Sequence, residues 1–171
     1  MNDEGAVLQT LATNRRAVLS RIAFLVLATV VLLYWISRRL PDSFPFLAGI
    51  FVVIMIYPLY RLLYLLFAGS ALIVTDRGLI DRTSGLGFLS WSHIRGGTLR
   101  PYFGLKLLDL DLTDQNEILA RLPLLRRLVW RYYLGQGGAF YINTSFVVGG
   151  AEALRQIISD RAPGAVIGRV V

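Results

Sequence analysis

The sequence predicts an α+β protein in which a transmembrane hairpin of two helices precedes a small β-rich domain closed by a C-terminal helix. Three observations support this prediction. Two uncharged apolar runs of helical length lie close together near the N-terminus. Short apolar runs separated by turn residues follow from about residue 70. A last segment, residues 151–161, repeats its apolar residues with the spacing of an amphipathic helix.

The composition distinguishes the two parts of the chain. Of 171 residues, 55% are hydrophobic and 17% are charged, whereas an ordinary soluble domain has about 45–50% and about 25%. The excess of apolar residues lies between Ile22 and Val74. The chain has no cysteine, which excludes disulfides, cysteine-ligated zinc and thiol catalysis. Its net charge of +7 favours an anionic membrane surface over nucleic acid as the partner, because the anchor already places the protein at a membrane.

Residues 17–69 are predicted to form the hairpin, with spans at about 17–37 and 44–67. Each span supplies the roughly 20 residues that cross about 30 Å of hydrocarbon. The connection between them is short, so we expect antiparallel neighbours whose outer ends emerge on the same side. Basic and aromatic side chains near the ends of a span are typical of the membrane interface. The predicted interfacial anchors are Arg21, Arg61, Tyr34 and Trp35.

Two other interpretations of the apolar runs fit the sequence less well. A signal peptide would end in a small-x-small cleavage site, whereas here a second apolar run follows directly. Core helices of a soluble bundle would keep a polar face, which both runs lack. Arginines before the first span and after the second outnumber Arg38 and Arg39 in the connection. The positive-inside rule therefore predicts cytoplasmic N- and C-termini, with residues 1–16 as a cytoplasmic segment.

The domain at residues 70–161 is expected to be an antiparallel meander interrupted by a helix. Its predicted strands cover residues 71–75, 79–82, 87–94, 98–103, 105–112 and 139–144. Before the last strand, a basic helix is predicted at about 122–134, with Pro123 in its first turn. Residues 162–171 are expected to form a loose tail.

The basic helix is the one segment that the sequence predicts to be functional. A helix of this kind lies in the headgroup region with its apolar side in the membrane and its arginines on phosphates. The predicted membrane-contacting residues are Arg121, Arg126, Arg127, Arg131 and Trp130. The alternative is a helix packed on the sheet whose arginines face water. Both interpretations stay open, because the arginines occupy more than one side of the helix.

The sequence contains no catalytic or metal-binding pattern. His93 is the only histidine, and no second histidine or cysteine is available to share a metal. Asp109, Asp111 and Asp114 lack the accompanying glycine and glutamate of a calcium loop. Neither a nucleophile elbow nor a P-loop lysine occurs. We therefore expect no enzyme, no metal and no cofactor, and the lack of charge deep in the spans argues against a transport path.

The segment LIVTDRGLIDRTSGLGFLSWSHI, residues 72–94, resembles the signature of bacterial pleckstrin-homology-like proteins. It is most similar to an uncharacterised family of small bacterial membrane proteins with two N-terminal transmembrane helices and one such domain. GGAFYINTSFVV, residues 137–148, is similar to that family's closing segment, so the resemblance covers residues 17–161. It implies a split β-barrel capped by the C-terminal helix, and it implies no characterised activity. Ser92-His93 stand where the family usually has an acidic residue.

These features together predict a non-catalytic, membrane-tethered, pleckstrin-homology-like binding module in the bacterial inner (cytoplasmic) membrane, with a multi-pass anchor. Its predicted partners are membrane lipids, whose anionic headgroups the basic helix contacts. The alternative is an accessory or scaffold subunit that binds another membrane protein. The sequence names neither the ligand, nor the protein partner, nor the oligomeric state.

Overall fold

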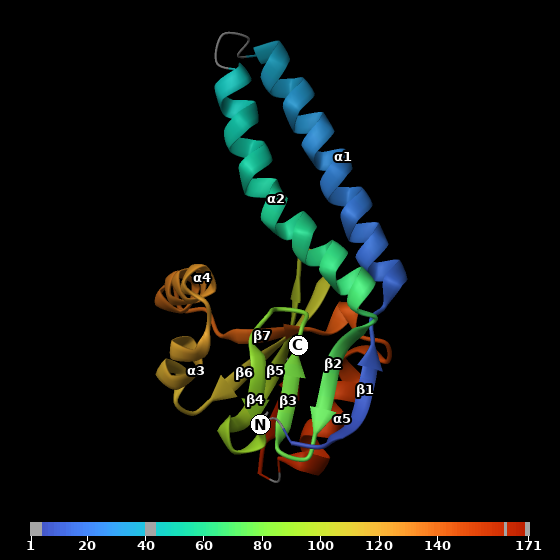
Figure 1. Ribbon diagram of the computed structural model, residues 1–171, viewed down its shortest axis with the longest axis vertical. Coiled ribbons are helices and arrows are strands. Elements are labelled where there is room, and N and C mark those ends of the chain that lie inside the picture. Colours follow the sequence, from blue (N-terminus) through green and yellow to red (C-terminus); the bar gives the residue numbers. More distant parts are fainter. Residues whose placement is uncertain (1–4, 40–43, 163, 170–171) are drawn as a thin grey trace. The chain divides into compact units, whose positions relative to one another are not determined.

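The computed structural model describes residues 5–39, 44–162 and 164–169, and it divides into two compact units (Figure 1). The helical unit contains residues 15–69. The β unit contains the described residues that precede Arg15 together with those from Ser70 onward. Parts of three predicted segments lie outside the described residues: 1–4 of the N-terminal segment, 40–43 at the connection of the spans, and 163, 170 and 171 of the tail.

The helical unit consists of α1 (Arg15–Arg39) and α2 (Phe44–Ala68), which pack against each other. Each helix has 25 residues, which at 1.5 Å per residue is longer than the roughly 30 Å of a bilayer's hydrocarbon core. Both are long and apolar enough to cross a membrane. Most of their apolar side chains are exposed, whereas a core helix of a soluble protein buries them. The two predicted apolar helices are confirmed.

The first sheet of the β unit is antiparallel, with the strand order β1-β2-β3-β4. Its strands are β1 (Val7–Ala12), β2 (Ser70–Thr75), β3 (Gly78–Asp81) and β4 (Gly87–Ser90). A tight turn joins β2 to β3, in which Thr75 Oγ1 accepts a hydrogen bond from the Gly78 amide at 3.0 Å. A Cβ atom at Gly78 would lie 2.2 Å from the carbonyl oxygen of Leu89, so only glycine fits this position.

The second sheet has the strand order β7-β6-β5-β8. Its strands are β5 (Ile94–Tyr102), β6 (Leu105–Leu112), β7 (Phe140–Asn143) and β8 (Val166–Arg169). Neighbours are antiparallel except β5 and β8, which run parallel. The 3-10 turn η2 (Trp91–His93) leads from β4 into β5. Among the described residues the two sheets do not close into a barrel, so the structure shows a mixed α+β fold with two sheets.

Three helices belong to the β unit: α3 (Gln115–Arg121), α4 (Leu124–Gly135) and α5 (Gly150–Arg161). The predicted basic helix at about 122–134 corresponds to α4. Leu122 is extended, as expected for a residue before proline, and this break at Pro123 separates α4 from α3. On α5, Leu154 and Ile158 are fully buried, so the predicted C-terminal helix packs on the core.

The predicted strand 87–94 is divided by η2 into β4 and the start of β5, and β5 also includes the predicted strand 98–103 up to Tyr102. Two further strands lie where the sequence predicts none. β1 lies in the predicted cytoplasmic segment 1–16, and β8 lies in the predicted loose tail 162–171. All residues of β1 except Leu11 are exposed, so the strand lacks the apolar alternation that marks a half-buried strand. It forms because it pairs with β2, a segment that is distant in sequence. In the same way, β8 depends on its parallel partner β5.

The core of the β unit joins both sheets to α5. Its fully buried side chains include Leu72, Leu79, Leu89, Leu108, Phe140, Ile142, Leu154 and Ile158. A buried carboxylate, Asp81, lies at the end of β3. It accepts hydrogen bonds from Thr83 Oγ1 at 2.6 Å and from the amides of Thr83, Ser84 and Leu86. Thr83 Oγ1 also accepts a hydrogen bond from the Asn143 amide at 3.1 Å, which links the two sheets.

Candidate functional site

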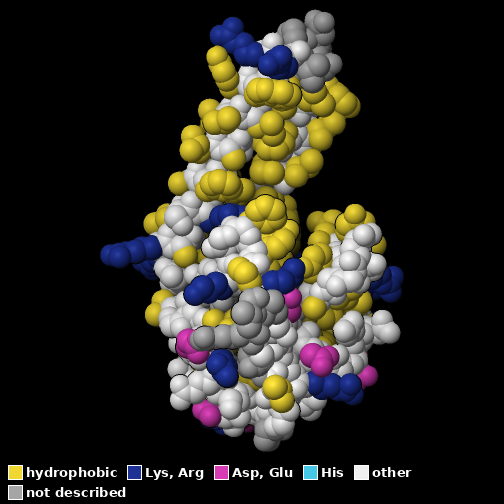
Figure 2. Space-filling model, turned by 180° about the vertical axis from the view of Figure 1, so that it is seen from behind, with side chains coloured by type: hydrophobic (Ala, Val, Ile, Leu, Met, Phe, Trp, Pro, Cys, Tyr) yellow, Lys and Arg dark blue, Asp and Glu magenta, His cyan; other side chains and the backbone are white. Residues whose placement is uncertain are grey.

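One face of α4 carries a continuous group of exposed apolar side chains, and Figure 2 shows hydrophobic side chains gathered over this part of the β unit, on the right of the view. This group, the α4 apolar face, consists of Leu124, Leu125, Leu128, Val129 and Tyr132, with exposed fractions of 70, 63, 53, 58 and 73%. Positions 124, 128 and 132 form one i, i+4 row, and 125 and 129 form the adjacent row. Exposed apolar groups of this extent mark binding surfaces.

The opposite face of α4 fixes the helix to the second sheet. Trp130 is buried, and its ring centroid lies 5.1 Å from that of Phe140 and 5.0 Å from that of Tyr141. The Tyr133 hydroxyl accepts a hydrogen bond from Arg100 Nη2 at 2.9 Å. This packed aromatic cluster holds the α4 apolar face outward, because a helix anchored by one face must present the other.

Two of the predicted arginines bind backbone carbonyls within the β unit. Arg127 donates from Nε to the Leu119 carbonyl at 3.0 Å and from Nη2 to the Leu122 carbonyl at 3.1 Å. These carbonyls lie at the C-terminal end of α3, where helical partners are missing, so Arg127 acts as a cap. Arg126 donates from Nη1 to the Gly85 carbonyl in the β3–β4 loop at 3.1 Å. Both side chains therefore hold α4 in place.

The other two predicted arginines are exposed. Arg121 pairs with Glu117, one turn earlier on α3, and an exposed pair of this kind contributes about 0–1 kcal/mol to stability. Arg131 is exposed, and at 3.6 residues per turn it lies beside the row 124, 128 and 132. Arg131 is thus the predicted arginine that borders the α4 apolar face.

The five residues predicted to contact the membrane therefore occupy three kinds of place. Trp130 packs in the core, Arg126 and Arg127 bind carbonyls, and Arg121 and Arg131 are exposed. The surface of α4 is formed instead by apolar residues that the sequence argument did not select. Their i, i+4 spacing could have indicated an apolar face on this helix. However, α4 also has an aromatic side, and the sequence alone does not say which side packs on the sheet.

A depression of about 200 Å³ lies where α3 and α4 meet the β3–β4 loop. Its lining includes the side chains of Phe88, Arg121 and Arg126 and the backbone of Gly85. Two guanidinium groups at one small opening can bind a phosphate through charge-assisted hydrogen bonds. Glu117 offsets part of this charge because it pairs with Arg121.

Three candidate metal ligands gather near the start of α3. Ligand atoms of His93, Asp114 and Glu117 lie within 4.8 Å of one another, and His93 Nε2 is 3.9 Å from Glu117 Oε2. The cluster was not predicted, because it combines one histidine with two carboxylates and contains no second histidine or cysteine. Both carboxylates are exposed, and Glu117 is already paired with Arg121. These features favour ordinary surface ion pairing over a metal centre.

The predicted interfacial anchors lie near the two ends of the helical unit. Near the start of α1, Arg21 Cζ is 5.1 Å from the centroid of the Phe24 ring. Near the end of α2, Arg61 Cζ is 5.7 Å from the centroid of the Tyr64 ring. Two exposed aromatic residues mark the other end of α1: Tyr34 and Trp35. Basic and aromatic residues at both ends of an uncharged middle are typical of a membrane span.

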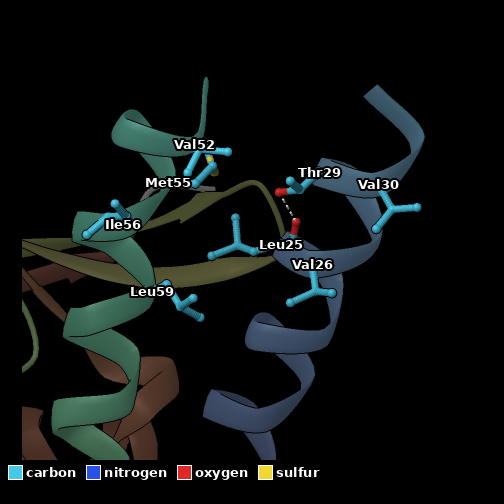
Figure 3. Close-up of a pocket in the computed structure, with 8 residues that line it drawn as sticks. All are labelled: Leu25, Val26, Thr29, Val30, Val52, Met55, Ile56 and Leu59. Carbon is cyan, nitrogen blue, oxygen red and sulfur yellow. Dashed lines mark hydrogen bonds between the residues drawn. The ribbon is translucent and has the colours of Figure 1, made fainter. Parts of the chain in front are cut away.

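Between α1 and α2 lies an apolar opening of about 230 Å³ (Figure 3). Leu25 of α1 and Leu59 of α2 extend into the space between the helices. Among the described residues that line it, Thr29 is the one with a polar side chain, and its hydroxyl donates to the Leu25 carbonyl at 2.7 Å. The opening therefore suits an acyl chain or an apolar side chain and has no group to bind an ion.

Comparison with known proteins finds no match to this chain among family models, curated proteins or solved structures. The resemblance of residues 72–94 and 137–148 to pleckstrin-homology-like proteins therefore stays a prediction. Any functional conclusion depends on the residues of the chain itself.

Proposed function

We propose that this protein is a non-catalytic, membrane-tethered binding module at the inner surface of a bacterial cytoplasmic membrane. α1 and α2 cross the bilayer as a hairpin, and both termini lie in the cytoplasm. The β unit binds the adjacent lipid surface through the α4 apolar face. The observation that carries this proposal is five exposed apolar side chains on a unit whose chain continues into two helices of membrane-spanning length.

Because of the tether, a weak lipid contact is enough to keep the β unit bound to the membrane surface. Because the hairpin keeps the β unit near the bilayer, a surface contact acts at high effective concentration. Complete burial of a leucine or valine side chain contributes about 1.5–3 kcal/mol. If three side chains of the α4 apolar face contribute roughly 1 kcal/mol each, the lipid-bound state is favoured about a hundredfold.

Anionic headgroups supply a second, electrostatic contribution. Arg131 borders the α4 apolar face, and the depression with Arg121 and Arg126 lies beside the first turn of α4. A basic residue near an anionic membrane surface contributes about 1 kcal/mol, and salt screens this interaction. The apolar face gives the contact its depth, and the arginines make it prefer anionic lipid.

The order of elements supports assigning the β unit to the pleckstrin-homology-like class as part of the proposal. Antiparallel strands follow one another through two sheets, and α5 then packs Leu154 and Ile158 against the core. The parallel strand β8 and the unclosed sheets differ from a simple split barrel. Fold analogy carries no ligand with it, so the lipid contact is argued from α4 alone.

A single-cysteine label tests the assignment of α4. The chain has no cysteine, so Leu128→Cys in the full chain gives one site for a polarity-sensitive fluorophore. In nanodiscs of phosphatidylethanolamine and phosphatidylglycerol, we expect blue-shifted emission that lipid-borne spin labels quench and aqueous iodide does not. Gln156→Cys, exposed on α5, is the matched control and should be quenched by iodide. Equal iodide quenching at both sites would contradict the proposal.

The electrostatic part has its own test. Replacing phosphatidylglycerol by phosphatidylcholine should reduce lipid quenching of the label at position 128, and so should high salt. Arg131→Gln should reproduce part of this loss, because Arg131 is exposed and borders the α4 apolar face. Quenching that depends neither on lipid charge nor on Arg131 would leave an apolar contact without headgroup preference.

The alternative function, an accessory or scaffold subunit for another membrane protein, is favoured by the apolar opening between α1 and α2. Co-purification from native membranes in mild detergent, with bound proteins and lipids both identified, tests it. Met55→Trp would fill part of the opening. Loss of one stoichiometric protein partner in this variant would favour the scaffold function over lipid binding.

A further inference from the structure

The turn between β5 and β6 places an aromatic residue in a conformation that asparagine or glycine normally adopts. Tyr102 and Leu105 are the last paired residues of the hairpin, so Phe103 and Gly104 form a two-residue turn. Their φ angles are +46° and +75°. Two positive φ values are characteristic of a type I′ turn, whose first position favours asparagine or aspartate. A bulky residue at positive φ is strained, so turn chemistry does not account for Phe103.

Packing does not account for Phe103 either. Its side chain is 78% exposed, and that of Tyr102 is 46% exposed. The two rings meet edge to face with centroids 4.8 Å apart. The pair contributes little to the core and presents apolar surface at the apex of a turn. A residue that breaks a local rule without a packing gain indicates a role outside the folded unit.

The part of this hairpin next to the turn is joined, through residues 144–146, to the residues that precede α1. The Lys106 amide donates to Ser145 Oγ at 2.7 Å, and Thr144 Oγ1 donates to the Lys106 carbonyl at 2.7 Å. In the same segment, the Phe146 carbonyl accepts a hydrogen bond from the Asn14 amide at 2.8 Å. Asn14 continues directly into α1. The turn therefore projects from the end of the β unit where the chain enters the helical hairpin, an arrangement that Figure 1 shows within the β unit.

Basic groups stand at the base of the aromatic turn. Lys106, the only lysine of the chain, follows the turn, and Arg100 Cζ lies 5.6 Å from the centroid of the Tyr102 ring. Aromatic rings above cationic groups are typical of interfacial anchors, with the rings at the acyl boundary and the cations at phosphates. Arg100 is already ion-paired with Asp109 at 2.7 Å and donates to Tyr133, so it joins the turn to α4, and Lys106 supplies the charge for a phosphate.

We propose that the Tyr102-Phe103 turn is a second membrane-inserting element, which enters the headgroup–acyl boundary of the leaflet next to the β unit. This inference rests on the proposed membrane tether and adds a separate contact to it. With a single contact at α4, the orientation of the β unit on the lipid surface could still change. Contacts at α4 and at the turn together fix the face that the β unit turns toward the bilayer.

A second labelled variant tests the turn in the full chain. Phe103→Cys carries the same fluorophore in the same nanodiscs of phosphatidylethanolamine and phosphatidylglycerol. Arg77→Cys is the matched control. Arg77 is exposed in the turn after β2, and β2 begins at Ser70, next to α2, so this turn follows the other end of the strand. We expect lipid-borne spin labels to quench the label at 103 several-fold more than the label at 77, and iodide to show the reverse. Equal quenching at the two sites would overturn the inference.

Two substitutions at position 103 separate insertion from folding. Phe103→Asn installs the residue that a type I′ turn prefers, so we expect an unchanged or higher melting temperature. The same variant should weaken the lipid quenching of a label at 128, whereas Phe103→Trp should preserve it. A fall in melting temperature for Phe103→Asn would show that the phenylalanine has a structural role and would overturn the inference.

The labels at 103 and 128 distinguish this inference from the proposed function. A label at 128 in lipid with a label at 103 in water overturns the turn assignment and leaves the α4 assignment standing. A label at 103 in lipid with a label at 128 in water supports the turn and overturns α4. Two labels in water overturn both.

Discussion

Ala12 faces Ser70 across the β1–β2 ladder, so the residues that flank the helical hairpin are paired neighbours in one sheet. Thr13 extends this attachment through a bridge to Val147. The hairpin is therefore an insertion into a β unit whose first strand precedes it. Since both connections leave from adjacent strands, the chain tethers the β unit at two points and restricts its motion more than a single linker would.

Removing the hairpin is expected to give a soluble, folded β unit. If residues 14–69 are replaced by about four Gly/Ser residues, β1 and β2 become an ordinary hairpin. We expect cooperative thermal unfolding with little loss of stability, measured by circular dichroism. A chain of residues 70–171 is the control. It lacks β1 and the buried Leu11, so it should melt lower and aggregate through the exposed edge of β2. Equal melting temperatures would contradict a structural role for β1.

The helices of the hairpin could be predicted because their signal is local. Residues 22–37 and 43–60 contain no charge, and the bilayer dictates the length of a span. β1 and β8 could not be predicted in the same way, since an edge strand with exposed residues has no internal periodicity and exists through a distant partner. Their partners are β2 and β5, and no feature of the local sequence identifies either pairing.

The position of the basic helix α4 was predicted, but the face that packs on the sheet was not. Its arginines suggested a membrane contact, but Arg126 and Arg127 reach carbonyls of the β3–β4 loop and α3. Long side chains with several donors serve phosphates and carbonyls equally well, and only the fold decides between them. Trp130 illustrates the same limit, because an aromatic residue is as suitable for a core as for a membrane interface.

Two substitutions in α4 should separate folding from lipid binding. Trp130→Ala removes a buried ring that packs on Phe140 and Tyr141, so we expect a loss of about 3–5 kcal/mol in the free energy of unfolding. Leu128→Ser changes an exposed side chain and should alter stability by less than about 0.5 kcal/mol. Chemical denaturation of the hairpin-deleted unit measures both values. In the full chain, Leu128→Ser should nevertheless weaken the proposed contact of α4 with lipid.

Arg127 should prove more important for stability than for membrane binding. Arg127→Met keeps the apolar stem and removes the hydrogen bonds to the Leu119 and Leu122 carbonyls, so we expect a loss of about 1–3 kcal/mol. Arg131→Met is the control and should change stability by less than about 0.5 kcal/mol. The prediction fails if the two variants unfold at the same denaturant concentration.

The turn around Asp81 should be sensitive to any change of its carboxylate. Asp81→Ala would leave the Thr83 hydroxyl and three amides without their acceptor. Because unsatisfied buried donors cost about 1–3 kcal/mol each, we expect a loss of at least about 3 kcal/mol. Thr83→Val should lose less, since the amides keep their acceptor. The loss of stability in Thr83→Val should include that of the hydrogen bond from the Asn143 amide to Thr83 Oγ1. In urea unfolding, we expect the free energy of unfolding to decrease in the order wild type, Thr83→Val, Asp81→Ala.

The ionisation of Asp81 gives a pH dependence with a definite sign. Burial raises the pKa of this carboxyl above 3.8, and the hydrogen bonds that it accepts lower the pKa by less. In the pH range above 3.8 the folded state then binds more protons than the unfolded state, so the contribution of Asp81 to stability falls as the pH rises through that range. Asp81→Asn does not titrate. The free energy of unfolding of wild type minus that of Asp81→Asn, measured by urea unfolding at a series of pH values from about 4 upward, should therefore decrease as the pH rises. A value of this signed difference that increases with pH would show that the four donors outweigh burial and that the turn stabilises the ionised carboxylate.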